Sequence, residues 1–261
     1  MNYGLHLSAS GVLTSMYRQD VYANNLANSE TVAFKPDFAS VLRRAPESQE
    51  GAFGLDLRHD LLDRLGGGVF AGSQSINFDT GTMQKTGNPL DLAIENPTSF
   101  FAVSAMDPNS GKHQVMLTRD GRLTRNEDNY LITVAGGHRV LDLADKPIQL
   151  PVGPLAVNRS GQISQGDVVV GQVQISKVTD EQALTKQGQN LFKINGSRTL
   201  RQMDDEPSVL SGFIEASGTD PITELMDLID ASKSATSNAN LIRYHDLLLD
   251  RAVNTLGRVL A

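Results

Sequence analysis

The chain contains no cysteine among its 261 residues. This absence excludes thiol catalysis, a disulfide framework and zinc sites with cysteine ligands. A cysteine-free protein tolerates reducing and oxidising compartments alike, so the composition does not say which of them the protein occupies.

Long hydrophobic runs and dense clusters of positive charge are also missing. No segment approaches the roughly 18 consecutive apolar residues of a membrane-spanning helix. The start, Met-Asn-Tyr-Gly-Leu-His-Leu-Ser, lacks the basic region and the continuous apolar core of a secretory signal. The net charge is −7, and no Lys/Arg stripe could neutralise phosphates. We therefore expect a soluble protein without a cleavable signal peptide. We also expect it to bind neither nucleic acid nor anionic membrane surfaces.

Residue patterns of known active sites are absent as well. The five histidines show no metal-ligand spacing. The glycines at 66–68 fail the dinucleotide fingerprint, and no Gly-x-Ser-x-Gly elbow occurs. Asp91 follows a turn signal, where a lone carboxylate usually anchors the turn. We therefore predict that the protein is not an enzyme and takes no cofactor, metal or small-molecule substrate.

Each end of the chain carries a helical stripe of small and apolar residues at spacings of four and three. A seven-residue apolar repeat is typical of a coiled-coil seam. The sequence therefore predicts long terminal helices that form a coiled-coil-like pair. The N-terminal stripe is Leu5, Ala9, Val12, Met16, Ala23 and Leu26, and the C-terminal stripe is Leu225, Leu228, Ser232, Ala235, Ala239, Ile242, Asp246, Leu249, Val253, Leu256 and Leu260.

Local signals give the ends of these helices. The first helix should end near Ala27-Asn28. The last should begin with Asp220 as its cap, Pro221 in the first helical position and Glu224 at the positive end of the dipole. It should run for roughly 35–40 residues, several times the usual globular length, and therefore needs a partner along its length.

The middle of the chain has a β-strand pattern. Short apolar runs alternate with turn signals, which favours antiparallel strands over βαβ units. Expected strands include residues 90–94, 100–103, 115–117, 168–170 and 173–175. The fold class is therefore α+β, with a mainly antiparallel β middle domain. The predicted organisation is an N-terminal helix and following segment at 1–43, a linker with a short helix at 44–75, a β-rich domain at 76–214 and a C-terminal helix at 215–261.

Two long motifs and three short ones stand out along the chain. The first long motif is Ala-Asn-Asn-Leu-Ala-Asn-Ser-Glu-Thr-Val-Ala-Phe-Lys at 23–35. The second is Gly-Thr-Met-Gln-Lys-Thr-Gly-Asn-Pro-Leu-Asp-Leu-Ala-Ile at 81–94, followed by Phe-Phe-Ala-Val at 100–103. The shorter motifs lie at 117–121, 190–192 and 211–217. All five resemble signatures of the bacterial flagellar rod and hook protein family, and within it the rod group, although Ala33 stands where the family has glycine.

The resemblance implies a structural subunit of the rod, the shaft that crosses the periplasm and transmits torque from motor to hook. It implies that the terminal segments form an inner tube and the β domain lies outside. The implied partners are copies of itself, other flagellar rod proteins and the flagellar type III export apparatus. Residues 33–38 resemble a proximal-rod protein more than a distal-rod protein. A distal-rod or hook subunit is the alternative, and an extracytoplasmic β-domain enzyme or binding module is a remote one.

Three asparagines surround the apolar pair Leu26-Ala27. They could cap a fraying helix end, or they could cross-link neighbouring helices and fix their register. We favour the second interpretation because capping does not require this arrangement. The candidate assembly residues are Leu5, Val12, Met16, Asn24, Asn25, Leu26, Asn28, Leu225, Leu228, Ile242, Leu249, Val253 and Leu256.

Overall fold

The computed structural model describes residues 3–45, 67–106, 111–195, 201–204 and 206–256, without the side chains of Tyr3, Thr255 and Leu256. The chain forms two compact units. The helical unit comprises residues 1–27, 37–75 and 220–261, and the β unit comprises residues 28–36 and 76–219. Within the described residues, an α-helix lies at each end and the sheets are antiparallel, so the predicted α+β class is confirmed. The short helix predicted within the 44–75 linker falls on residues 57–65, which lie outside the described residues.

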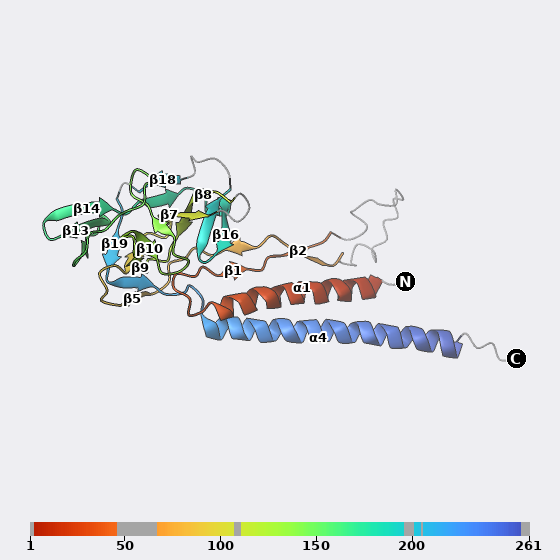
Figure 1. Cartoon of the computed structure of the whole chain (residues 1–261). Helices are drawn as coiled ribbons and strands as arrows, with labels where there is room; N and C mark the ends of the chain where they lie inside the picture. Colours follow the sequence, from red (N-terminus) through yellow and green to blue (C-terminus); the bar gives the residue numbers. More distant parts are fainter. Residues whose placement is uncertain (1–2, 46–66, 107–110, 196–200, 205, 257–261) are drawn as a thin grey trace. The chain divides into compact units, whose positions relative to one another are not determined.

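The helical unit contains the two long helices, which pack side by side (Figure 1). Helix α1 spans Tyr3–Ala27, and α4 spans Pro221–Arg251 before a π-helical turn, η3, at Ala252–Leu256. The cap prediction is confirmed, because the Asp220 side chain accepts a hydrogen bond from the Ile222 N–H and Pro221 occupies the first turn. The first helix also ends as predicted, at Ala27.

Helix α1 packs against α4 and also against a β-ribbon. In this ribbon, β2 (Val41–Arg43) pairs with β3 (Val69–Ala71). The short strand β1 (Asp37–Phe38) pairs with β4 (Ser75–Ile76). Two partners explain why Thr14 and Val21 of α1 are buried although they are not part of the predicted stripe.

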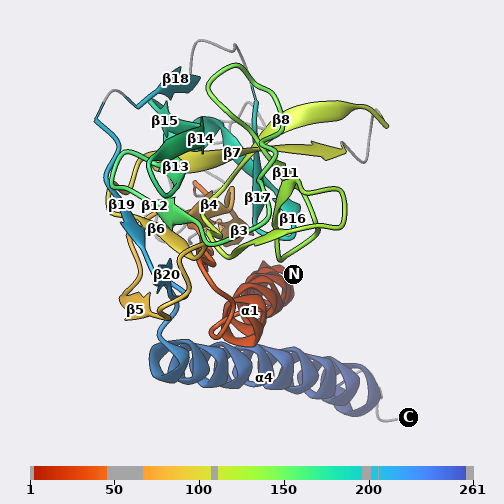
Figure 2. The ribbon, with the colours of Figure 1, turned by 60° about the vertical axis from the view of Figure 1, so that its left-hand side comes forward.

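The β unit is built around strand β7 (Ser99–Met106), which pairs with β8, β11 and β15 (Figure 2). The main sheet follows the order β16-β17-β8-β7-β11-β10-β9, with β15 beside β7 and β18 beside β15. Its other strands are β8 (His113–Thr118), β9 (Leu123–Arg125), β10 (Leu131–Thr133), β11 (Arg139–Val140), β15 (Ile175–Val178), β16 (Leu184–Gly188), β17 (Leu191–Ile194) and β18 (Arg201–Met203).

Smaller sheets and one short helix complete the β unit. The three-stranded sheet is β12 (Ala156–Val157), β13 (Gln162–Gln165) and β14 (Val168–Gln172). The two-stranded ones are β6 (Leu92–Ile94) with β19 (Val209–Ser211), and β5 (Met83–Lys85) with β20 (Phe213–Glu215). The 3₁₀ helix η1 covers Glu181–Ala183.

Strand β7 has a core on each face, because successive side chains of a strand point to opposite sides. Phe101, Val103 and Ala105 belong to one hydrophobic cluster. Phe100 and Ala102 belong to the other, in which Phe100 stacks edge-on against Phe78 and Phe192 with ring centroids 5.7 and 5.8 Å away. A strand buried on both faces explains the uninterrupted apolar run Phe-Phe-Ala-Val.

Candidate functional site

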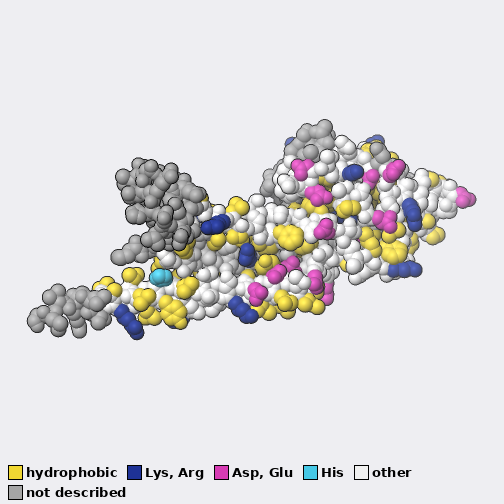
Figure 3. Space-filling model, turned by 180° about the vertical axis from the view of Figure 1, so that it is seen from behind, with side chains coloured by type: hydrophobic (Ala, Val, Ile, Leu, Met, Phe, Trp, Pro, Cys, Tyr) yellow, Lys and Arg dark blue, Asp and Glu magenta, His cyan; other side chains and the backbone are white. Residues whose placement is uncertain are grey.

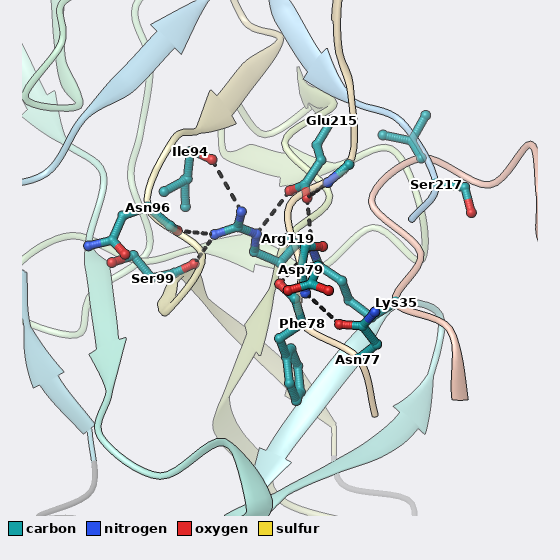
Figure 4. A network of polar contacts seen from close by, with 12 residues as sticks. Lys35, Asn77, Phe78, Asp79, Ile94, Asn96, Ser99, Arg119, Glu215 and Ser217 are labelled. Atoms are coloured by element: carbon teal, nitrogen blue, oxygen red, sulfur yellow. Dashed lines mark hydrogen bonds and ion pairs between the residues drawn. The ribbon is translucent and has the colours of Figure 1, made fainter. Parts of the chain in front are cut away.

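Three charged side chains from three signature-like motifs meet inside the β unit (Figure 4). Glu215 Oε1 lies 2.6 Å from Lys35 Nζ, and Glu215 Oε2 lies 2.9 Å from Arg119 Nε. Their side chains are at most 1% exposed. We call Lys35, Arg119 and Glu215 the junction network. Charges buried so deeply are tolerated only when they are paired and hydrogen-bonded.

Backbone carbonyls complete the bonding of both cations. Lys35 Nζ donates to the carbonyls of Phe78 and Asp79, at 3.3 and 2.8 Å. The Arg119 guanidinium donates to the carbonyls of three residues, Ile94, Asn96 and Ser99. Burial lowers the pKa of Lys35; the Glu215 carboxylate opposes this effect and the Arg119 charge adds to it.

This bonding gives the network a structural role. Both Glu215 oxygens accept from cations, and Oε1 also accepts from the Gly81 N–H at 2.9 Å. The carboxylate of Glu215 is therefore fully engaged in contacts within the chain.

Residues 28–36, here called the signature segment, are held by contacts on several sides. The Ala33 N–H donates to the Glu215 carbonyl at 2.8 Å, and the Gly218 N–H donates to the Phe34 carbonyl at 2.9 Å. From the β16–β17 hairpin, Lys186 Nζ donates to the Lys35 carbonyl at 2.6 Å and lies 4.5 Å from the Phe34 ring centroid. Asn190 Nδ2 donates to the Val32 carbonyl at 2.8 Å.

The sequence analysis identified the motifs but not the network that joins them. Lys35, Arg119 and Glu215 come from motifs far apart along the chain, so only the fold brings them together. One signal was available. Lys35 and Glu215 each follow a large apolar residue in segments otherwise typical of buried structure, Phe34 and Ile214 respectively.

Ala33 is buried with a φ of 56°, in the left-handed region that disfavours side chains with a Cβ. Ala33→Gly should therefore raise the free energy of unfolding by about 0.5–1 kcal/mol, since the relieved strain exceeds the cost of the freer glycine and the lost methyl contacts. Urea unfolding measures this. The control is Ala102→Gly in β7, which should cost about 1–2 kcal/mol. Equal destabilisation by both variants would contradict the strain argument.

The helical unit has its own contact line between α1 and α4. Ser15 Oγ donates to Ser234 Oγ at 3.1 Å, and Asn25 Nδ2 donates to Glu224 Oε1 at 3.1 Å. A Cβ added at Gly4 would lie 2.9 Å from His245 Nε2, and one added at Gly11 would lie 2.7 Å from Asn238 Nδ2. The residue numbers of each pair add to the same value, as a straight antiparallel helix pair requires.

The contact line consists of small and polar residues, so it differs from the predicted apolar stripes. Of the predicted stripe on α4, Leu228 and Ile242 are half-buried, whereas Leu225, Leu249 and Val253 are 46, 40 and 71% exposed. On α1, Leu5, Val12 and Leu26 are half-buried and Met16 is 51% exposed. The side chain of Leu256 lies outside the described residues. These residues remain candidates for assembly.

The three asparagines have separate surroundings. Asn25 is buried, and its side chain exchanges hydrogen bonds with the backbone of Asp37 while also reaching Glu224. Asn28 accepts hydrogen bonds from the N–H and hydroxyl of Thr31 in the turn after α1. Asn24 is exposed. Contacts within the chain therefore account for Asn25 and Asn28, and an interchain role for all three remains a proposal.

Burial raises the pKa of Glu224 above 4.5, assisted by repulsion from Asp227 and Asp220 and opposed by the Asn25 hydrogen bond. Between 4.5 and the raised value, the folded state keeps a proton that the unfolded state has lost. The free energy of unfolding should therefore fall as pH rises through this window. Urea unfolding of wild type and Glu224→Gln at several pH values checks this. The stability advantage of wild type over the variant should shrink with rising pH, and an advantage that grows would refute it.

Large apolar side chains remain exposed along the helical unit. Figure 3 shows hydrophobic side chains gathered on the surface formed by the terminal helices. We call the exposed members of α1 and α4 the apolar helix face: Leu13, Met16, Ile222, Leu225, Met226, Ile229, Leu241, Tyr244, Leu247, Leu248, Leu249 and Val253. Large apolar side chains exposed in such number along two helices indicate an interaction surface.

Within the described residues, histidine, aspartate and glutamate side chains form no cluster that could hold a metal ion. Neither long helix, as far as it is described, combines the length and apolar character needed to cross a membrane.

Comparison with known proteins identifies relatives over nearly the whole chain. A flagellar basal-body rod protein FlgF from Caulobacter vibrioides is 33% identical over 261 residues, covering 99% of this chain and 100% of its own. The FlgF of Rhizobium meliloti is 30% identical, and the match covers 98% of this chain and 99% of the relative. A flagellar basal-body rod protein FlgG from Caulobacter vibrioides is 28% identical, and the match covers 94% of this chain and 96% of the relative. No protein-family model matches the chain. With such identity over nearly its full length, the chain belongs to the family of flagellar basal-body rod proteins.

Proposed function

We propose that this chain is a structural subunit of the flagellar basal-body rod, and that it assembles through the apolar helix face into a shaft that transmits torque from motor to hook. The observation that carries this assembly mode is the exposed apolar face on two helices whose mutual contact uses small and polar residues. A face that the described residues leave uncovered is available to neighbouring chains.

The energetics favour burial of this face. Each large apolar side chain contributes about 1.5–3 kcal/mol when it is fully buried. Several such residues per subunit would offset the cost of ordering and association. Close helix packing also suits a torque-bearing shaft, since packed protein interiors have low compressibility.

We infer that α1 and α4 form a coiled-coil-like pair within this assembly. Gly4, Gly11 and Asn25 lie at multiples of seven residues along the contact line, which supports this geometry. The small side chains allow the two backbones to approach closely. The predicted stripe residues, among them Leu225, Leu249 and Val253, then lie where other chains can cover them.

The proposed partners are further copies of the chain and other flagellar rod proteins. Contacts between different surfaces of successive subunits generate a helical filament when they do not close into a ring. We also propose delivery by the flagellar export apparatus, on the strength of the family resemblance.

Within the rod, we propose a proximal position, supported by the resemblance of residues 33–38 to proximal-rod proteins. A distal-rod or hook position is the second candidate. The relatives are named as flagellar basal-body rod proteins, which gives the enzyme alternative no support.

A density map of purified basal bodies tests the proposal. Subunits with this fold should occupy the shaft, with α1 and α4 packed against neighbouring copies and the apolar helix face covered. Their height along the axis separates a proximal from a distal position. A shaft that lacks this chain in a motile strain that expresses it would refute the proposed function.

A further inference from the structure

The junction network lies where the chain leaves the β unit. The chain passes between the two units at residues 27/28, 36/37, 75/76 and 219/220. Lys35 lies directly before the second crossing, Phe78 and Asp79 follow the third, and Glu215 precedes the fourth. The Lys35 ammonium contacts all three of those partners. One buried cation therefore bonds to chain segments next to three crossings.

Backbone contacts at the same place reinforce this arrangement. The Asn77 N–H donates to the Pro36 carbonyl at 2.9 Å. The signature segment and residues 215–218 also bond to each other through Ala33 and Gly218. Arg119 extends the network into the β unit, because it binds Glu215 on one side and carbonyls from β6, the following loop and β7 on the other.

The signature segment lies outside the sheets of the β unit, although residues 33–36 are buried. It forms no strand, and its contacts include the network, the two backbone bonds to residues 215–218, the Asn77–Pro36 bond and the β16–β17 hairpin. The two hydrophobic clusters of the β unit include none of its residues. The segment therefore adds neither strand pairing nor a side chain to those clusters.

We propose that the junction network is a conformational device that fastens the signature segment to the β unit, and that its loss releases this segment while the sheets stay folded. The consequence for torque rests on the proposed function. A rod subunit with a released segment should enter the shaft but transmit load between its helices and its β unit less well.

Amide exchange on the full-length chain tests the fastening itself. The variants are Glu215→Gln, which removes the shared negative charge, and Lys35→Met, which removes the ammonium but keeps a long side chain. Peptides covering residues 28–36 should exchange at least about tenfold faster in either variant, and peptides covering β7 and β8 should be accelerated by a clearly smaller factor. The control is Asp145→Asn, which breaks the more exposed pair with Arg201 and should change neither region.

Two results would overturn the fastening. One is wild-type exchange over residues 28–36 in both variants. The other is a matching loss of protection over 28–36 and β7 in both, which would make the network part of the global core. A double variant shows whether the effect of a single substitution comes from the shared bond rather than from unfolding of that variant. Lys35→Met should add little once Glu215→Gln is present, since both act through the same bond, and additive effects would contradict the proposal.

A second experiment addresses the mechanical consequence. Cells carrying Lys35→Met should contain the variant in purified basal bodies at wild-type amounts, and their swimming should decline more steeply than wild type as medium viscosity rises. Unchanged swimming at every viscosity would refute the mechanical role. Absence of even the wild-type chain from basal bodies would refute the proposed function instead, and it would leave the exchange result standing.

Discussion

Replacing Leu249 with aspartate is expected to prevent the chain from entering the rod while leaving its fold unchanged. Leu249 is 40% exposed on α4, so the isolated chain should lose no more than about 0.5 kcal/mol. Burial of the same carboxylate against a neighbouring subunit would cost several kcal/mol, unless it becomes protonated. A cost of this size at every subunit contact weakens association by a factor of about a hundred or more.

Fractionation of basal bodies and a swimming assay measure this effect. Leu249→Met is the matched control, because it keeps an apolar side chain of similar volume and should assemble normally. Circular dichroism of the purified variant checks that the chain still folds. Normal swimming of the strain with Leu249→Asp would show that Leu249 is not part of the assembly surface.

The second large effect is expected for Arg119→Met, which should lower the free energy of unfolding by about 3–5 kcal/mol. This change leaves one Glu215 oxygen without its cation and removes the donor for the Ile94, Asn96 and Ser99 carbonyls. The cost of breaking a buried pair exceeds the modest net value of forming it, because the remaining charge stays desolvated.

Urea unfolding followed by circular dichroism gives the magnitude. The control is Arg201→Met, whose partner Asp145 is 41% exposed, and a pair of that kind contributes about 0–1 kcal/mol. Arg119→Lys should recover only part of the loss, since an ammonium lacks the planar fork of donors. A cost for Arg119→Met as small as that of the control would show that the junction network contributes little to stability.

Features encoded by adjacent residues were predictable from the sequence. Asp220 and Pro221 mark the start of α4 because capping depends only on local geometry. The run at 100–103 indicates a buried strand because β-branched and aromatic residues favour that environment. Its burial on both faces follows from the fold, which places a second layer of side chains on each side of β7.

Features that depend on pairing between distant residues were not predictable in the same way. Apolar periodicity does not predict the α1–α4 contact line, because this line includes the small residues Gly4, Gly11 and Ser15. The junction network was not predictable because the sequence does not say which opposite charge Lys35 or Glu215 will pair with. Only the topology of the fold places the two side chains together. The family motifs marked the right segments without indicating their common purpose.

Within the described residues, the register of the helix pair leaves the far end of α4 without a counterpart on α1. Gly4 of α1 faces His245, and the described part of α1 starts at Tyr3, so Leu247, Leu248, Leu249 and Val253 extend past it as an apolar overhang. In a filament of identical subunits assembled as proposed, the next subunit along the axis would cover each overhang. One end of such a filament then always presents uncovered overhangs, so growth is directional and the last subunit added is the least stably held.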